Sequence, residues 1–184
     1  LLGGRQNPGF TPLLKEKPDY VIRAFCLGMQ TMNVAAGGTM VQDIASEIYK
    51  LRFVEDYLAL DESKRHDNYW SRLFPHDNFF WCHFQPIRFK PESPFVREMG
   101  MGREEYPLVC SSHHQAVKKL GRDLQAAAVS LDGKVVEALT HQRYRNLLGV
   151  QFHPENGAIY AAEGNGHKVS PADTVLVTMH DYLK

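Results

Sequence analysis

The chain has 184 residues, which suits one domain with a substantial core. Apolar residues make up 43% and aromatic residues 11%, a composition that excludes a disordered chain. Lys and Arg number 21, as do Asp and Glu, so no global field favours nucleic acid or an anionic membrane. No apolar stretch approaches the roughly 20 residues that a membrane-spanning helix needs. The sequence therefore indicates a globular protein without a nucleic-acid or membrane partner.

The three cysteines, Cys26, Cys82 and Cys110, are widely spaced and form no Cys-x-x-Cys motif. This usage favours free thiols in a reducing compartment, and we expect a cytoplasmic protein. The sequence begins with Leu1-Leu2-Gly3-Gly4, which is typical of a buried strand that runs into a tight turn. We therefore expect the natural protein to begin earlier.

In chain order, apolar periodicity and turn residues predict one α/β domain with a mixed sheet. Gly37-Gly38 ends the first expected helix, and Asp132-Gly133 is a strong hairpin-turn signal. The segment 61–81 is aromatic and irregular, and its role is left open between a pocket wall, a subunit contact and a small cluster beneath a loop. The expected strands are 21–25, 81–89, 106–110, 124–131, 135–139 and 146–152, and the expected helices are 27–36, 45–60 and 172–183.

The segment 24–30 places Cys26 where an apolar, strand-like run gives way to a helix-like one. A sharp strand-to-helix turn would lift the thiol above the end of the sheet and leave the amide of Leu27 free to face an oxyanion. Gly28 fits a helix that packs close to the strand. Taken alone, the motif fits a buried structural cysteine equally well.

The segment 148–155 ends an apolar run in His153 and Glu155. Residues two apart at a strand end point the same way, so both side chains can face one site. Taken alone, a surface pair at the end of an edge strand is the simpler interpretation. Together with a cysteine, however, an imidazole and a carboxylate are the parts of a nucleophilic acyl-transfer site.

Two weaker signals remain. Gly3-Gly4 could offer a second oxyanion amide, although two glycines after a strand are more often only a turn. The adjacent His113 and His114 suggest a metal, but no Cys or His cluster has zinc-ligand spacing, and neighbours on a strand point apart. The sequence therefore predicts no metal site.

In combination, the motifs resemble the class I glutamine amidotransferase-like proteins, and most of all the peptidase C26 branch, the γ-glutamyl-γ-aminobutyrate hydrolases. The resemblance rests on the ordered segments 26–44, 109–117 (Val-Cys-Ser-Ser-His-His-Gln-Ala-Val), 124–138 and 148–155 (Leu-Gly-Val-Gln-Phe-His-Pro-Glu). It covers residues 20–45 and 106–155 well and the intervening residues only in outline.

The resemblance implies a flavodoxin-like three-layer α/β/α sandwich with a mostly parallel central sheet, in a single domain over 1–184 that lacks its N-terminal strands. It implies no metal or organic cofactor. The implied site consists of Cys26 as nucleophile, His153 as general base and acid, Glu155 as its orienter, an oxyanion hole from Leu27 and the Gly3-Gly4 turn, and Gln30, Ser111, His113 and Gln115 near the γ-glutamyl group.

The sequence departs from the family pattern at three positions. Ala24 stands where the elbow usually has glycine, and Cys110 stands where asparagine is common. Leu27 replaces the arginine frequent in the hydrolase branch and matches the amidotransferases proper.

Three functions follow from the resemblance. The leading expectation is a cysteine hydrolase that cuts the γ-glutamyl amide bond of a small substrate, with a homodimer left open. The alternative is a glutaminase that delivers ammonia to a separate synthase, its required partner. A non-catalytic binding protein fits least, because a retired site has no chemical reason to keep a thiol, an imidazole and a carboxylate together.

Overall fold

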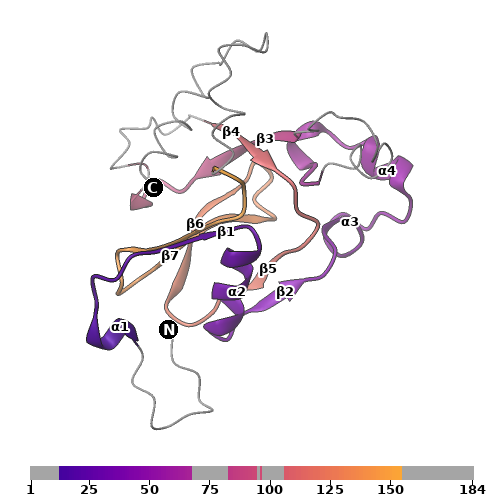
Figure 1. Ribbon diagram of the computed structural model, residues 1–184. Helices are drawn as coiled ribbons and strands as arrows, with labels where there is room; N and C mark the ends of the chain where they lie inside the picture. Colours follow the sequence, from indigo (N-terminus) through magenta and orange to yellow (C-terminus); the bar gives the residue numbers. More distant parts are fainter. Residues whose placement is uncertain (1–12, 68–82, 95, 97–105, 155–184) are drawn as a thin grey trace, which may run out of the picture.

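A computed structural model of the chain describes residues 13–67, 83–94, 96 and 106–154 (Figure 1). Its helices are α1 (Leu13–Glu16), α2 (Leu27–Ala35), α3 (Ile44–Glu47) and α4 (Val54–Leu58), with the 3-10 helix η1 (Glu62–Lys64). Its strands are β1 (Ile22–Phe25), β2 (Thr39–Val41), β3 (His83–Phe89), β4 (Leu108–Ser111), β5 (Ala116–Lys119), β6 (Leu124–Ser130), β7 (Val136–His141) and β8 (Leu147–Val150). None of these helices has the length and apolar character that a membrane crossing requires.

The strands form a six-stranded sheet in the order β1-β8-β7-β6-β3-β4 and a two-stranded sheet, β2-β5. The expected α/β class and mixed sheet are thereby confirmed. The mostly parallel sheet is not found among the described strands, where β1 and β8 form the one parallel pair. The reason is local. A tight turn at Asp132-Gly133 joins β6 to β7, and Gly133 has a φ of 75° there. A short turn can join only antiparallel neighbours.

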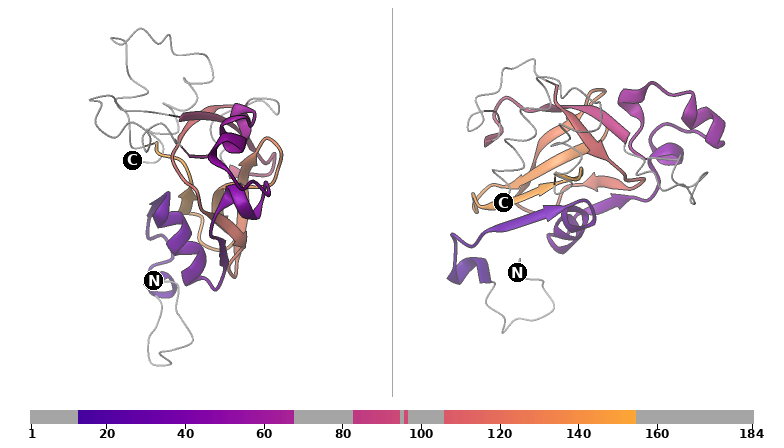
Figure 2. Two further views of the ribbon diagram at one scale, coloured as in Figure 1. Left: turned by 90° about the vertical axis from the view of Figure 1, so that its right-hand side faces the viewer. Right: turned by 45° about the horizontal axis from the view of Figure 1, so that its top comes forward.

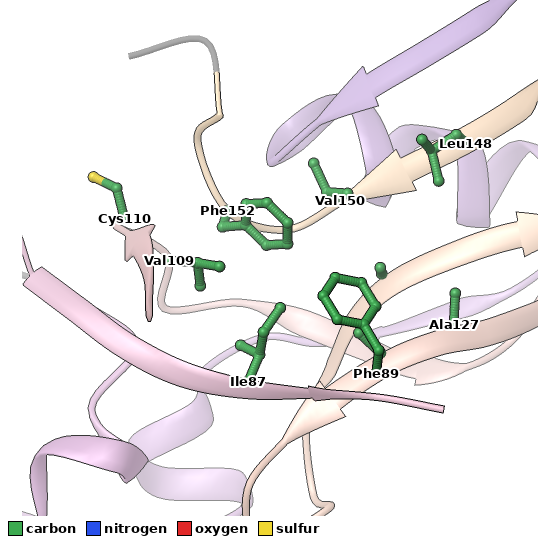
Figure 3. Close-up of a cluster of buried hydrophobic side chains, with 10 residues drawn as sticks. Ile87, Phe89, Val109, Cys110, Ala127, Leu148, Val150 and Phe152 are labelled. Carbon is green, nitrogen blue, oxygen red and sulfur yellow. The ribbon is translucent and has the colours of Figure 1, made fainter. Parts of the chain in front are cut away.

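The six-stranded sheet is curled, so that its β4 edge approaches the chain that follows β8 (Figures 1 and 2). The backbone N–H of His153 donates to the carbonyl of Cys110 at 3.0 Å, which ties this segment to β4. A buried apolar cluster fills the curl, and Figure 3 shows Phe152 beside Val150 with Ile87 and Val109 facing them. The core thus holds the end of β8 in a fixed place.

Helix α2 covers the sheet at β1 and β8. Its buried Met29 and Met32 pack with Leu139 and Leu147 in a second apolar cluster. Gly149 makes this approach possible, because a Cβ there would lie 2.7 Å from Met29 Cγ and 2.6 Å from Met32 Cε. The absence of a side chain at this one strand position therefore brings α2 down onto β8.

The single helix expected over 45–60 is wrong. The chain forms two short helices instead, α3 and α4, and Lys50 between them has a positive φ of 61° that a helix interior does not allow. Asp43 starts α3 by accepting the amide of Ser46 at 2.7 Å. The apolar spacing does not mark one buried face, since Val54 is 41% exposed while Tyr57 is buried.

Candidate active site

The backbone at Cys26 is the most unusual feature of the candidate site. Cys26 joins β1 directly to α2 with φ 44° and ψ −108°, a conformation that residues with a Cβ rarely adopt. Holding such a conformation costs about 1–3 kcal/mol and occurs where surrounding contacts impose it. Here the amide of Cys26 donates to Val150 at 2.9 Å, and its carbonyl accepts the amide of Gln30 at 3.1 Å. The sharp turn expected at Cys26 is therefore present.

The methyl group of Ala24 does not disturb this turn. Ala24 is buried, and a Cβ at Gly28 would lie 3.5 Å from the Ala24 Cβ, an ordinary contact distance. The Ala24 methyl therefore fits beneath the first turn of α2, and it would still fit if residue 28 carried a Cβ. Leu27 is the first residue of α2, so its amide is among those that an α-helix leaves unused internally.

A hydrogen-bonded pair of glutamines lies beside the thiol. Gln151, which is fully buried, donates from Nε2 to Cys26 Sγ at 3.6 Å, and its Oε1 accepts from Gln30 Nε2 at 3.3 Å. The same Gln30 amide lies 3.4 Å from the carbonyl of Gln115. Cys26 itself is half-buried. The Gln151 amide therefore contacts a partly accessible thiol, and Gln30 holds that amide in place.

His153 leaves the sheet at the same edge as Cys26. In the parallel pair, Phe25 is the partner of Val150, so Cys26 and Gln151 both follow directly after paired residues. His153 comes two residues later and is half-buried. Its action as the base for Cys26 stays a prediction. Glu155, the expected orienter, and Gly3-Gly4, the expected second part of the oxyanion hole, lie outside the described residues.

The residues expected near the γ-glutamyl group fall into two sets. Gln30 and Gln115 belong to the amide network beside Cys26. Ser111 and His113 are buried, and the Ser111 hydroxyl donates to the carbonyl of His66 at 2.8 Å. Their part in binding a γ-glutamyl group stays a prediction.

Comparison with known proteins places this geometry in a family. The sequence model of the peptidase C26 family matches residues 14–155, which include β1, the elbow at Cys26 and the segment with His153. The chain belongs to the peptidase C26 family.

Named relatives of this peptidase C26 chain come from several bacteria. A glutamine amidotransferase-like protein of Rickettsia prowazekii is 50% identical over 163 residues, covering 74% of this chain and 54% of the relative. One of Lactococcus lactis is 29% identical over 134 residues, covering 73% and 45%. The chain thus spans about half the length of these relatives. A solved glutamine amidotransferase from Thermotoga maritima is 14% identical with a TM-score of 0.45, covering 93% of this chain and 61% of the other.

A second polar cluster of this peptidase C26 chain, which sequence reasoning missed, lies in the interior. His66, His113 and Glu137 are all buried and come together from three separate segments. Glu137 stands within an apolar strand, and this isolated charge was the signal that could have indicated the cluster. His66 had no such signal. Gln151 was also missed, although it lies two residues before His153 and follows the same alternation.

Proposed function

We propose that this peptidase C26 chain is part of a cysteine hydrolase that cleaves the γ-glutamyl amide bond of a small substrate. The observation that supports the proposal best is the strained turn at Cys26, with φ 44° directly between β1 and α2. Such strain persists where function uses it, and here it lifts a half-buried thiol above the sheet at the start of a helix.

The reaction would proceed in two steps. His153 takes the thiol proton of Cys26 as the sulfur attacks the γ-carbonyl carbon, and the Leu27 amide donates to the oxygen that becomes negative. The C–N bond then breaks, the amine leaves with a proton from His153, and a γ-glutamyl thioester remains. His153 then deprotonates a water molecule, which attacks the thioester. The C–S bond breaks, glutamate leaves, and His153 returns the proton to the Cys26 sulfur. Amide and water balance both steps, so the proposal needs no cofactor.

The glutamine pair would position the nucleophile. The Gln151 amide donates to the sulfur, and Gln30 holds the Gln151 side chain through its carbonyl oxygen. Neither side chain can exchange a proton at neutral pH, so both act by orientation. This arrangement would restrict the rotation of the thiol and keep its sulfur aimed at the bound carbonyl.

A glutaminase activity is the second candidate. Leu27 at the position after the nucleophile favours it, and several relatives carry glutamine amidotransferase-like names. The chemistry at Cys26 would be the same, with ammonia as the leaving amine and a separate synthase as its recipient. The two candidates therefore differ in the leaving group and in the partner.

The deciding experiment measures glutamate release by the full-length protein from a panel that includes γ-glutamyl-γ-aminobutyrate and glutamine, with Cys26→Ala as the matched variant. Release from the first substrate that disappears in the variant supports the hydrolase. Release from glutamine alone favours the glutaminase and directs a search for its synthase. If folded protein releases glutamate from no substrate, both activities are wrong.

A further inference from the structure

The buried cluster of His66, His113 and Glu137 presents an unusual balance of charge and hydrogen bonds. His66 Nδ1 lies 3.1 Å from Glu137 Oε1, and His113 Nε2 lies 3.7 Å from Glu137 Oε2. All three side chains are at least 98% buried. Yet His66 Nδ1, His113 Nε2 and Glu137 Oε2 have no hydrogen-bond partner, because their contacts lack the required geometry. Buried polar atoms without partners are rare and call for a reason.

The outer contacts of His66 fix its proton. Its Nε2 lies 3.3 Å from the hydroxyl of Tyr49, and that hydroxyl donates its single proton to Asp132 at 3.1 Å. The tyrosine oxygen can therefore only accept from His66, which places the imidazole proton on Nε2. The Nδ1 atom of His66 is thus the ring nitrogen left to bind a ligand, and it lies 3.1 Å from Glu137 Oε1.

A contact of the same kind locates the proton of His113. Its Nδ1 lies 2.9 Å from the backbone carbonyl of Gln115, and a carbonyl can only accept. The Nδ1 atom of His113 therefore carries a proton. Nε2 is then the nitrogen left to face Glu137, 3.7 Å from its Oε2.

Glu137 completes the set, because its two carboxylate oxygens face the free nitrogens of the two rings. Gln85 donates from Nε2 to Glu137 Oε1 at 2.8 Å and so fixes the carboxylate. Two imidazole nitrogens and a carboxylate thus converge in the interior with no hydrogen bond between them, and a bound cation would satisfy all three.

We propose that His66, His113 and Glu137 form a structural site for a divalent transition-metal ion, with Zn²⁺ as the first candidate. Two imidazole nitrogens and a carboxylate are a common zinc donor set. Ligand atoms about 2.1 Å from a tetrahedral Zn²⁺ lie about 3.4 Å apart. One ligand atom from each of the three residues lies within 4.8 Å of the other two, so side-chain movements would bring them to that spacing and leave the fourth position to water.

The outer hydrogen bonds match those of metal-bound histidines. Such rings donate their second N–H to a carbonyl or to another oxygen, which fixes the tautomer and the ring orientation. The Gln115 carbonyl does so for His113, and Tyr49 does so for His66. Support of this kind is what separates a preformed site from a chance cluster.

The position of the cluster indicates a structural role. His66 follows η1, His113 lies between β4 and β5, and Glu137 lies in β7, so one ion would join both sheets. The carbonyl of Gln115 accepts from His113 and also lies 3.4 Å from the Gln30 amide, next to the elbow. Because the cluster is buried, the ion would enter during folding and exchange slowly.

The test uses full-length protein carrying Cys26→Ser, which removes the accessible thiol as a competing ligand. This background is compared with Glu137→Gln and His113→Gln, and with His114→Gln as the matched control on the exposed neighbour. Each protein is unfolded with chelator, refolded with Zn²⁺ or with Co²⁺, dialysed and analysed for bound metal. The Co²⁺ proteins also give visible ligand-field spectra, which report nitrogen and oxygen coordination without any assay of activity.

We expect about one ion per chain in the background and in His114→Gln, and at least a tenfold loss of bound metal in Glu137→Gln and His113→Gln. The proposal is wrong if the Glu137→Gln variant retains its metal, or if the background protein retains none. The three residues would then form a proton-linked His–Glu cluster. If a variant fails to fold, the metal content and the Co²⁺ spectrum of the background protein decide whether the site exists. Bound Co²⁺ with histidine-carboxylate bands supports the site, and its absence refutes it.

Discussion

The elbow at Cys26 and the buried cluster at Glu137 are both energetically unfavourable, but in different ways. The elbow stores backbone strain, since Cys26 has φ 44°, while its side-chain neighbours Gln30 and Gln151 are hydrogen-bonded. The buried cluster has ordinary backbone, while His66 Nδ1 and Glu137 Oε2 have no hydrogen-bond partner. Strain beside an accessible group suits a reaction, whereas unpaired atoms in a sealed interior suit a bound cation.

This difference makes the two regions separable by mutation. A change at the elbow should alter the chemistry and leave the fold in place. A change in the buried cluster should first weaken the fold, because that cluster joins segments from η1, the β4–β5 connection and β7. Measurements of activity and of stability on the same variants therefore test the comparison directly.

The largest expected effect is on catalysis by Cys26→Ala. Removing the proposed nucleophile should lower kcat for γ-glutamyl amides by about 10⁴-fold or more, because the residual site cannot form the thioester. The melting temperature should stay close to that of the unchanged protein. Steady-state kinetics and thermal unfolding measure both quantities. Appreciable turnover by the pure variant would show that Cys26 is not the nucleophile.

Glu137→Ala should have the largest effect on stability. Removing the buried carboxylate leaves His66 and His113 without their central partner, and we expect a loss of about 3–5 kcal/mol in the free energy of unfolding. Urea unfolding measures this change. Arg143→Ala is the control, because it breaks an exposed ion pair with Asp123 and should change stability little. Equal effects of the two substitutions would contradict the role given to Glu137.

Gly149→Ala should be the next most disruptive substitution. The new methyl would meet Met29 and Met32 at less than 3 Å, so α2 must move away from β8, at a cost of about 1–3 kcal/mol. Activity should fall as well, since α2 begins at the elbow. The matched control is Gly28→Ala, where the methyl meets Ala24 at 3.5 Å and stability should be unchanged or slightly higher. A reversed order of stability would refute the packing argument.

Gln151→Met should reduce activity more than stability. Methionine keeps most of the volume but loses the donor to Cys26 Sγ and the acceptor for Gln30. We expect kcat to fall about tenfold, equivalent to about 1.4 kcal/mol, with KM little changed, because orientation of the thiol is lost rather than substrate contact. A rise in KM at constant kcat would instead make Gln151 a binding residue.

The smallest expected effect is the release of backbone strain. Glycine adopts the conformation of Cys26 readily, so Cys26→Gly should be about 1 kcal/mol more stable than Cys26→Ala. Both variants lack the thiol, and their difference therefore reports the backbone alone. Paired thermal unfolding curves provide the measurement. A less stable glycine variant would mean that the turn is not strained.

Local sequence signals predicted the parts of the fold whose causes are local. The strand before Cys26, the helix after it and the Asp132-Gly133 hairpin were all predicted and confirmed. The helix expected over 45–60 was wrong, because Lys50 adopts a left-handed conformation that apolar spacing does not reveal. The order of strands depends on pairings distant in sequence, such as β1 with β8, and periodicity alone does not specify them.

The same distinction applies to the candidate site. Cys26 stands in a continuous motif, so residue order alone located the turn that the structure shows. His66, His113 and Glu137 are scattered over three segments, and no spacing rule for metal ligands joins them. The adjacent His113 and His114 were predicted to point apart, and the structure confirms this, with His113 buried and His114 exposed.

The most direct test of the central claim is to trap the covalent intermediate. Full-length protein is mixed with γ-glutamyl-γ-aminobutyrate or with glutamine, quenched in acid within the first turnovers, and examined by peptide mass spectrometry. We expect a γ-glutamyl group on the peptide that contains Cys26, absent from the Cys26→Ala variant and removed by hydroxylamine. Turnover without any adduct on Cys26, or an adduct on another residue, would contradict it.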